Sequence, residues 1–126
     1  MENLKILITS SLLLLLLSCS SSMPRWIEEK KHAVSPDGKA VIYETILDGN
    51  QISVGTWVNS SSGSGGAGVF NIQSRDSSGV KLSWISDSTV LIEYPADSRI
   101  IRKEDSSFFA GRTINVKYKT KKLSPT

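Results

Sequence analysis

The fold class is decided by residues 80–94, which read VKLSWISDSTVLIEY. Apolar and polar residues alternate on both sides of a short Ser-Asp-Ser turn at residues 86–88. A period of two places every second side chain on one face of an extended chain, so the stretch predicts two half-buried β-strands. Pro95 ends the second strand because it lacks the N–H that a sheet ladder needs. The apolar residues that share a face are Val80, Leu82 and Trp84, then Val90, Ile92 and Tyr94.

Strands of the same kind are predicted on both sides of this stretch. Residues 40–47 are rich in Val, Ile, Tyr and Thr, which are typical of strands, and Asp48-Gly49-Asn50 closes them with a turn. The alternating residues 52–58 supply a hairpin partner. Two more short strands are predicted at residues 69–73 and 114–118.

The connecting stretches have different characters. Ser35-Pro36-Asp37-Gly38 predicts a tight turn, because Pro presets φ and Gly accepts a positive φ, and residues 75–79 predict another. We expect Asn59–Gly68 to form a low-complexity loop and Asp97–Gly111 to be irregular. Residues 26–34 suit either a helical turn or a strand. The chain is therefore expected to be mainly β, a small antiparallel sheet or sandwich of about six strands.

The N-terminus has the features of an export signal. Lys5 and the amino terminus are positive, and residues 6–17 form an apolar core too short to span a bilayer. The boundary Leu16-Leu17-Ser18-Cys19 resembles the lipobox of bacterial lipoproteins, in which the chain is cut before the cysteine and the thiol is acylated. This resemblance implies cleavage between Ser18 and Cys19 and a covalent lipid on Cys19 that anchors the protein to a membrane.

The cysteine content agrees with this interpretation. Cys19 is the only cysteine, so the exported part forms no internal disulfide, and acylation gives the lone thiol a role. The alternative is an ordinary cleaved signal with an incidental thiol. We expect a signal peptide at 1–18, a lipidated tether at 19–25 and a single β-rich domain at 26–126. In lipoproteins of two-membrane bacteria an Asp after the cysteine signals inner-membrane retention, so Ser20 implies the outer membrane, facing the periplasm.

The charge balance limits the possible partners. The formal net charge is +3, and it stays +3 when Glu2 and Lys5 leave with the signal peptide. These charges are spread along the chain and no nucleic-acid motif accompanies them, so we expect no nucleic-acid partner.

A second resemblance concerns the strands and their turns. Two segments resemble the repeat unit of TolB-type β-propellers. The first is the turn Ser35-Pro36-Asp37-Gly38-Lys39, and the second runs from Leu82 through Ser88 into Val90–Tyr94. A propeller needs at least about four four-stranded blades, and this chain has strands for about one and a half. The order of these motifs, with Gly68–Ile72 between them, is also similar to a family of small bacterial lipoproteins of unknown function. The motifs consist of turn and core residues and imply a fold without an activity.

Few residues are candidates for catalysis. His32 is the only histidine, and a catalytic histidine needs an orienting partner within hydrogen-bond reach. Glu44 and Glu93 lie in predicted strands, where they form either a carboxylate pair or solvent-facing side chains with Lys81 or Lys117 as cross-strand partners. One histidine and an acylated cysteine leave too few ligands for zinc. We therefore expect no catalytic residue, no metal site and no cofactor.

Two features suggest a surface for a partner. Phe108 and Phe109 are adjacent and point opposite ways in an extended chain; they either cap the core or offer an apolar contact. Lys117, Lys119, Lys121 and Lys122 make the C-terminal end basic. Edge-strand lysines that discourage aggregation explain these charges, and attraction to anionic lipid or cell-wall polymer is the alternative.

The sequence thus favours a non-enzymatic envelope lipoprotein that binds another envelope component near the membrane. The first alternative is an inhibitor or immunity-type lipoprotein that plugs a periplasmic hydrolase or toxin with residues 59–68 or 97–111. The second is a hydrolase that depends on Glu44, Glu93 or His32.

Overall fold

A computed structural model of the chain describes residues 23–74 and 79–122. The lipobox cysteine Cys19, the cleavage site and most of the predicted turn at 75–79 lie outside the described residues. The described elements are α2 (Arg25–Glu28), β1 (His32–Val34), β2 (Ala40–Leu47), β3 (Gln51–Ser60), β4 (Gly63–Gln73), β5 (Lys81–Trp84), β6 (Thr89–Pro95), β7 (Arg99–Lys103), β8 (Ser106–Phe109) and β9 (Arg112–Lys121).

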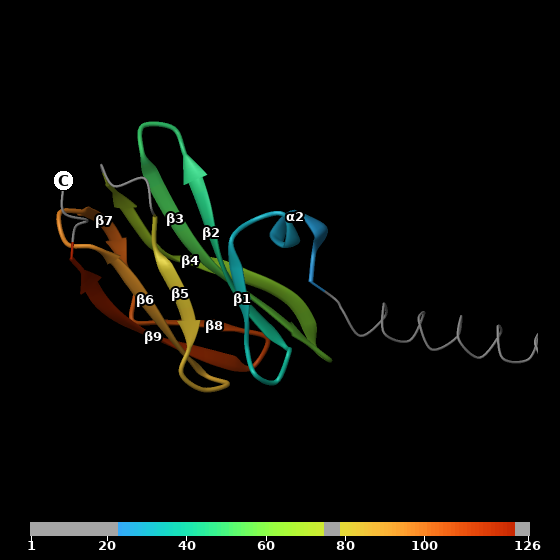
Figure 1. Ribbon diagram of the computed structural model, residues 1–126. Coiled ribbons are helices and arrows are strands. Elements are labelled where there is room, and N and C mark those ends of the chain that lie inside the picture. The colour runs from blue at the N-terminus through green and yellow to red at the C-terminus, as the bar shows by residue number, and fades with distance from the viewer. Residues whose placement is uncertain (1–22, 75–78, 123–126) are drawn as a thin grey trace, which may run out of the picture.

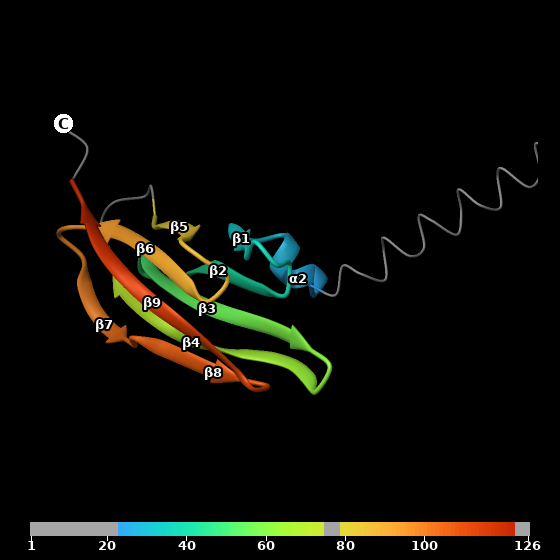
Figure 2. The same cartoon turned by 90° about the horizontal axis from the view of Figure 1, so that it is seen from below.

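The strands form two sheets that pack face to face (Figures 1 and 2). Sheet A has the order β1-β2-β3-β4-β7, and sheet B has the order β5-β6-β9-β8. All neighbouring strands are antiparallel except β6 and β9, which pair in parallel. This exception arises because the chain leaves sheet B after β6, adds β7 to sheet A, and returns through β8.

The core lies between the sheets and comes from alternate residues of each strand. In β9, Ile114 and Val116 are buried while Asn115 and Lys117 are exposed, as a period of two requires. Both sheets contribute to one cluster of buried side chains: Ala40, Ile42, Ile52, Val54, Val58, Val69, Phe70, Ile72, Val80, Val90, Ile92, Tyr94, Ile114 and Val116.

The predicted mainly β sandwich is confirmed, and its strand count is higher than expected. The six predicted strands all form, and β1, β7 and β8 bring the total in the described ranges to nine. The turn at Ser35–Gly38 closes with a 2.9 Å bond from the Gly38 N–H to the Ser35 carbonyl, and Gly38 has a φ of 75°. The ambiguous residues 26–34 contain both possibilities, a short helix and the strand β1.

The expected loop at Asn59–Gly68 was wrong. Ser60 ends β3 and Gly63 begins β4, so nearly all of this stretch belongs to the longest hairpin of sheet A. Its small residues serve close packing: a Cβ on Gly66 would fall 1.6 Å from the carbonyl oxygen of Thr56. A Cβ on Gly65 would fall 2.5 Å from Cζ of Phe109. Low strand propensity is overridden here because only glycine fits.

The expected irregular stretch at Asp97–Gly111 was also wrong. It contains β7, which pairs with β4 at the edge of sheet A, and β8, which pairs with β9 at the edge of sheet B. The sequence of β7 does not alternate because every position of the strand is exposed, and the pairing of β7 with β4 shifts register between Asn71 and Ile72. The apolar alternation that identifies a half-buried strand is therefore missing.

The close approach at Gly66 predicts a large difference between two neighbouring substitutions. Gly66→Ala should lower the free energy of unfolding by about 2 kcal/mol or more, because the strand backbones must separate. Gly68→Ala is the matched control, because the nearest atom to a Cβ at this position is a guanidinium nitrogen of Arg102 at 3.8 Å. Its effect on the free energy of unfolding should stay within about 0.5 kcal/mol. Urea unfolding of both variants tests this, and equal stabilities would contradict it.

Candidate functional site

The structure separates the residues that sequence reasoning considered for catalysis. His32 is half-buried on β1 at the edge of sheet A, and its Nδ1 lies 2.7 Å from the Lys30 carbonyl oxygen. Glu93 lies on β6 of sheet B, where it forms an ion pair with Lys81 across the strands at 3.7 Å. Within residues 23–74 and 79–122 no three His, Cys, Asp or Glu side chains gather in a way that could hold a metal ion.

Glu44 lies in the interior, so the expected solvent-facing placement was wrong. Its side chain is 8% exposed, and Oε2 accepts a 3.0 Å hydrogen bond from the Val80 N–H. Lys31 completes the cluster, with Nζ 3.7 Å from the carboxylate and a hydrogen bond to the Val80 carbonyl. The strand alternation contained the signal, because Glu44 shares a face with Ile42. This carboxylate connects β2 to the residue that precedes β5.

A second ionic cluster joins the first residue of β9 to the turns that contain Asp37 and Asp87. Arg112 donates to Asp37 at 2.9 Å and also to the Asp87 carbonyl. Burial alone would raise the pKa of Asp37. Hydrogen bonds from the Ser35 hydroxyl, the Lys39 N–H and Arg112 outweigh burial and lower the pKa from 3.8 to about 2. Both ionic clusters therefore act as structural connections between elements distant in sequence.

The outer face of sheet A carries an aromatic group next to the N-terminal tether. We call Trp26, Tyr43 and Trp57 the aromatic face. The Trp26 ring meets Tyr43 edge-on with centroids 5.2 Å apart and Trp57 edge-on at 6.1 Å. Tyr43 and Trp57 point outward because their neighbours along the strands, such as Ile42 and Val58, face the core. Trp26 comes from α2, which lies against this face through the fully buried Ile27.

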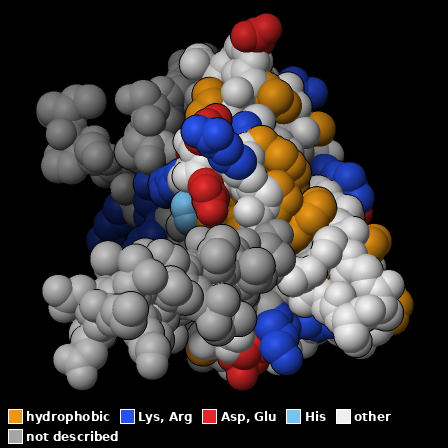
Figure 3. Space-filling view, turned by 90° about the vertical axis from the view of Figure 1, so that its right-hand side faces the viewer, with side chains coloured by type: hydrophobic (Ala, Val, Ile, Leu, Met, Phe, Trp, Pro, Cys, Tyr) orange, Lys and Arg blue, Asp and Glu red, His pale blue; other side chains and the backbone are white. Residues whose placement is uncertain are grey.

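Tyr43 and Trp57 are held in place by their surroundings. Tyr43 lies across Gly55, where a Cβ would fall 2.6 Å from the hydroxyl oxygen, and burial raises the pKa of Tyr43. The indole N–H of Trp57 is buried and has no hydrogen-bond partner in the described part of the chain. Trp26 remains 47% exposed, and Figure 3 shows hydrophobic side chains in a band on the side of the molecule that carries α2. The aromatic face thus offers a partly exposed apolar surface near the start of the domain.

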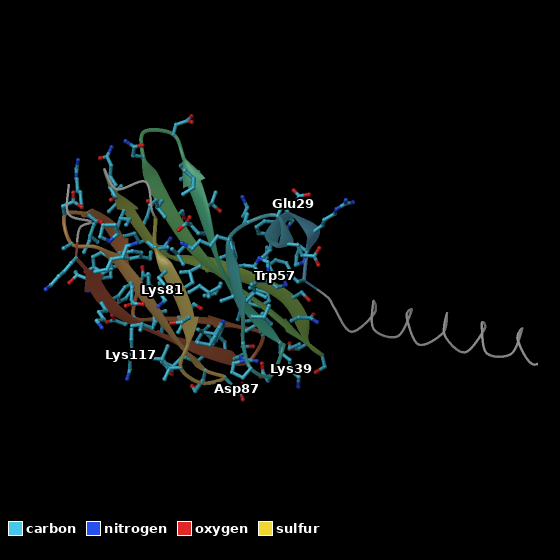
Figure 4. The ribbon with its side chains drawn as sticks, viewed as in Figure 1. Glu29, Lys39, Trp57, Lys81, Asp87 and Lys117 are labelled. Carbon is cyan, nitrogen blue, oxygen red and sulfur yellow. The ribbon has the colours of Figure 1, made fainter. Side chains whose placement is uncertain are left out.

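The outer face of sheet B carries the lysines of β9. We call Lys117, Lys119 and Lys121 the lysine face. Val116 and the largely inward Tyr118 fix these lysines on the outside, because alternate residues point to opposite sides. The prediction that these lysines lie on an edge strand is correct only in part. One side of β9 pairs with β6 along Thr89–Pro95, whereas on the other side β8 pairs only with the first residues of β9 and does not cover the rest of that side. Figure 4 shows Lys117 on sheet B and Trp57 below α2, on different sides of the molecule.

The two phenylalanines point in opposite directions, as expected. Phe108 is 70% exposed on the outer side of β8. Phe109 is 36% exposed and its ring covers Gly65, while Ser107 on the same side of β8 lies 3.0 Å from the Thr56 hydroxyl. Phe109 therefore contacts Gly65 of the other sheet while about a third of its side chain stays exposed, and a partner contact through Phe108 stays a prediction.

A shallow cleft of about 520 Å³ lies at the end of the sheets where β2 turns into β3. Its lining is polar and includes the carboxylate of Asp97 and the guanidinium of Arg99, and His32 is not among the lining residues. The residues around it are Gly49, Asn50, Gln73, Ser74, Asp97 and Arg99.

The chain matches no protein-family model, no curated protein sequence and no solved structure. No helix among the residues that the structure describes is long and apolar enough to cross a membrane.

The structural role of Glu44 can be tested against that of Glu93. Glu44→Gln should lower the free energy of unfolding by about 2 kcal/mol, because it leaves Lys31 without its charge partner beside a buried contact. Glu93→Gln removes the same charge from a more exposed pair and should cost less than about 0.5 kcal/mol. Thermal or urea unfolding measures both, and a larger loss for Glu93→Gln would contradict the assignment.

The lowered pKa of Asp37 predicts an acid-dependent stability. Because the pKa is lower in the folded state, the contribution is fully present above about pH 4 and is lost as the pH falls toward 2. At pH 6 the free energy of unfolding of wild type should exceed that of Asp37→Asn by about 1 kcal/mol, a modest value because the ion pair is partly exposed. This difference should shrink toward pH 2. Denaturant unfolding across this pH range tests it, and a constant gap would refute the role of ionisation.

Proposed function

We propose that the protein is a lipid-anchored envelope lipoprotein that acts without catalysis, as a binding module held close to the membrane. The lipobox at Leu16–Cys19 supports the anchor, and Ser20 supports the outer membrane, facing the periplasm. The absence of a shared catalytic site among Glu44, Glu93 and His32 in the described structure supports a binding role.

The position of the aromatic face is the observation that carries this proposal. Helix α2 begins only six residues after Cys19 and places Trp26 on the outer face of sheet A. A tether of this length reaches at most ~25 Å even when fully extended. Trp and Tyr are favoured at the boundary between lipid and water, because their rings are apolar and carry a polar group. We infer that the sheet A side of the domain faces the membrane.

The inhibitor alternative used residues 59–68 or 97–111 as a loop that plugs an active site. These residues are instead largely hydrogen-bonded strands, so the loops that suggested this alternative are not formed. We therefore retain the membrane-proximal binding module as the single proposed function.

The anchor is tested by the intact mass and the location of the protein in its own cells. Wild type should enter the outer-membrane fraction as a chain that begins at Cys19 and carries acyl mass. Cys19→Ala should lose the acyl mass, because no other thiol is present to accept lipid. Ser21→Ala is the matched control and should behave as wild type. A soluble, unacylated wild-type chain cut elsewhere would overturn the proposal.

A further inference from the structure

The outer face of sheet B is strongly asymmetric in charge. Its strand positions carry Lys81 and the three residues of the lysine face, against the single carboxylate of Glu93. Glu93 forms its ion pair with Lys81. Lys117 and Lys119 are exposed and have no ion pair with any described carboxylate. Glu93 lies opposite Lys119 in register but pairs with Lys81, so this face keeps an excess of positive charge.

The spacing within this row is regular. Lys117, Lys119 and Lys121 occupy every second position of one strand, so their Cα atoms lie ~6.7 Å apart along it. The parallel pairing of β9 with β6 holds the backbone spacing of this row fixed, and the half-buried Tyr118 lies between Lys117 and Lys119 on the opposite side of the strand. A row of cations that projects from one strand fits a linear anion with charges repeated along its length better than it fits a compact anion.

The lysine face and the aromatic face belong to the outer sides of different sheets. Packing the two sheets together turns these outer sides away from each other (Figures 2 and 4). When the aromatic face lies toward the anchoring membrane, the lysine face looks away from it. This placement favours an anionic partner in the space beyond the membrane rather than the lipid headgroups beside the anchor.

We propose that the lysine face binds an extended, carboxylate-bearing polymer of the envelope. The proposal deepens the proposed function by naming the chemical class of the partner. Lysine ammonium groups are mobile point charges, which bind a row of carboxylates without demanding one fixed geometry at each site. The half-exposed Leu91, which pairs with Lys117 in register, and the exposed Phe108 on β8 add apolar area to the same outer side.

The test measures binding of polygalacturonate, a linear glycan with a carboxylate on each sugar, to the purified protein in non-ionic detergent. Binding should weaken as salt rises, because salt screens exposed charges. The fully methyl-esterified polymer keeps the backbone without the charge and should not bind. This assay needs no anchor, so its outcome is independent of the fractionation of Cys19→Ala.

The decisive variant is the double substitution Lys117→Gln and Lys119→Gln, which should bind about 25-fold more weakly, since each lysine near an anionic surface contributes about fivefold. The pair Lys30→Gln and Lys39→Gln removes the same charge elsewhere and should change binding less than about twofold. Lys117 and Lys119 are exposed, so the double variant should unfold at the same midpoint as wild type. An unchanged midpoint excludes misfolding as the cause of weaker binding.

Three outcomes would overturn the proposal. The polymer does not bind, or both pairs weaken binding equally, which indicates a general charge effect. The third is that the lysine face binds vesicles of phosphatidylcholine and phosphatidylglycerol in equal parts while it leaves polygalacturonate unbound. That result would assign the surface to an anionic membrane instead.

Discussion

The packing of two sheets through their alternating side chains is the constraint on which the rest of the structure depends. In each strand the residues that enter the core determine which residues remain outside. Ile114, Val116 and Tyr118 face inward, and the lysines of β9 are consequently arrayed on the outer side. Ile42 faces the core, so Tyr43 points outward, where α2 covers it. The aromatic face and the lysine face are therefore two results of one packing arrangement, and this arrangement sets them on opposite sides.

Polar connections at the borders of the core hold the two sheets together. Glu44 binds the Val80 N–H beside Lys31, and the Trp84 indole donates to the Ala33 carbonyl at 2.8 Å, so β1 and β2 are linked to the β5 side of sheet B. At the other border Tyr118 donates to the Val69 carbonyl at 3.3 Å and also to the Glu104 carbonyl. Burial raises the pKa of Tyr118 to about 12, so the hydroxyl keeps its proton and remains a donor. Such bonds specify how the sheets align, whereas the apolar core supplies most of the stabilisation.

The sequence predicted the parts of this fold that depend on local pattern. Alternation and strand-forming composition together identified six strands, and turn residues such as Pro36 and Gly38 located the connections. The sequence prediction failed where tertiary contacts determine the structure. Gly65 and Gly66 were predicted to lie in a loop, but they belong to a strand in which the Phe109 ring and the Thr56 backbone leave room only for glycine. The lysine face was visible as an alternating row, but its place in the sheet depends on the parallel pairing of β6 and β9. The aromatic face requires the four-residue α2 to pack across two strands, and no sequence period encodes that contact.

The central claim is that the sheet A side rests near the membrane and the sheet B side faces away. Hydroxyl-radical footprinting of the lipidated protein tests it most directly, because each side carries an exposed aromatic reporter: Trp26 is 47% exposed and Phe108 is 70% exposed. Oxidation of both residues is measured by mass spectrometry in detergent and again in lipid bilayers. The account predicts that the bilayer protects Trp26 severalfold and leaves the oxidation rate of Phe108 unchanged. Protection of Phe108 with Trp26 still reactive would contradict it and place the lysine face against the membrane.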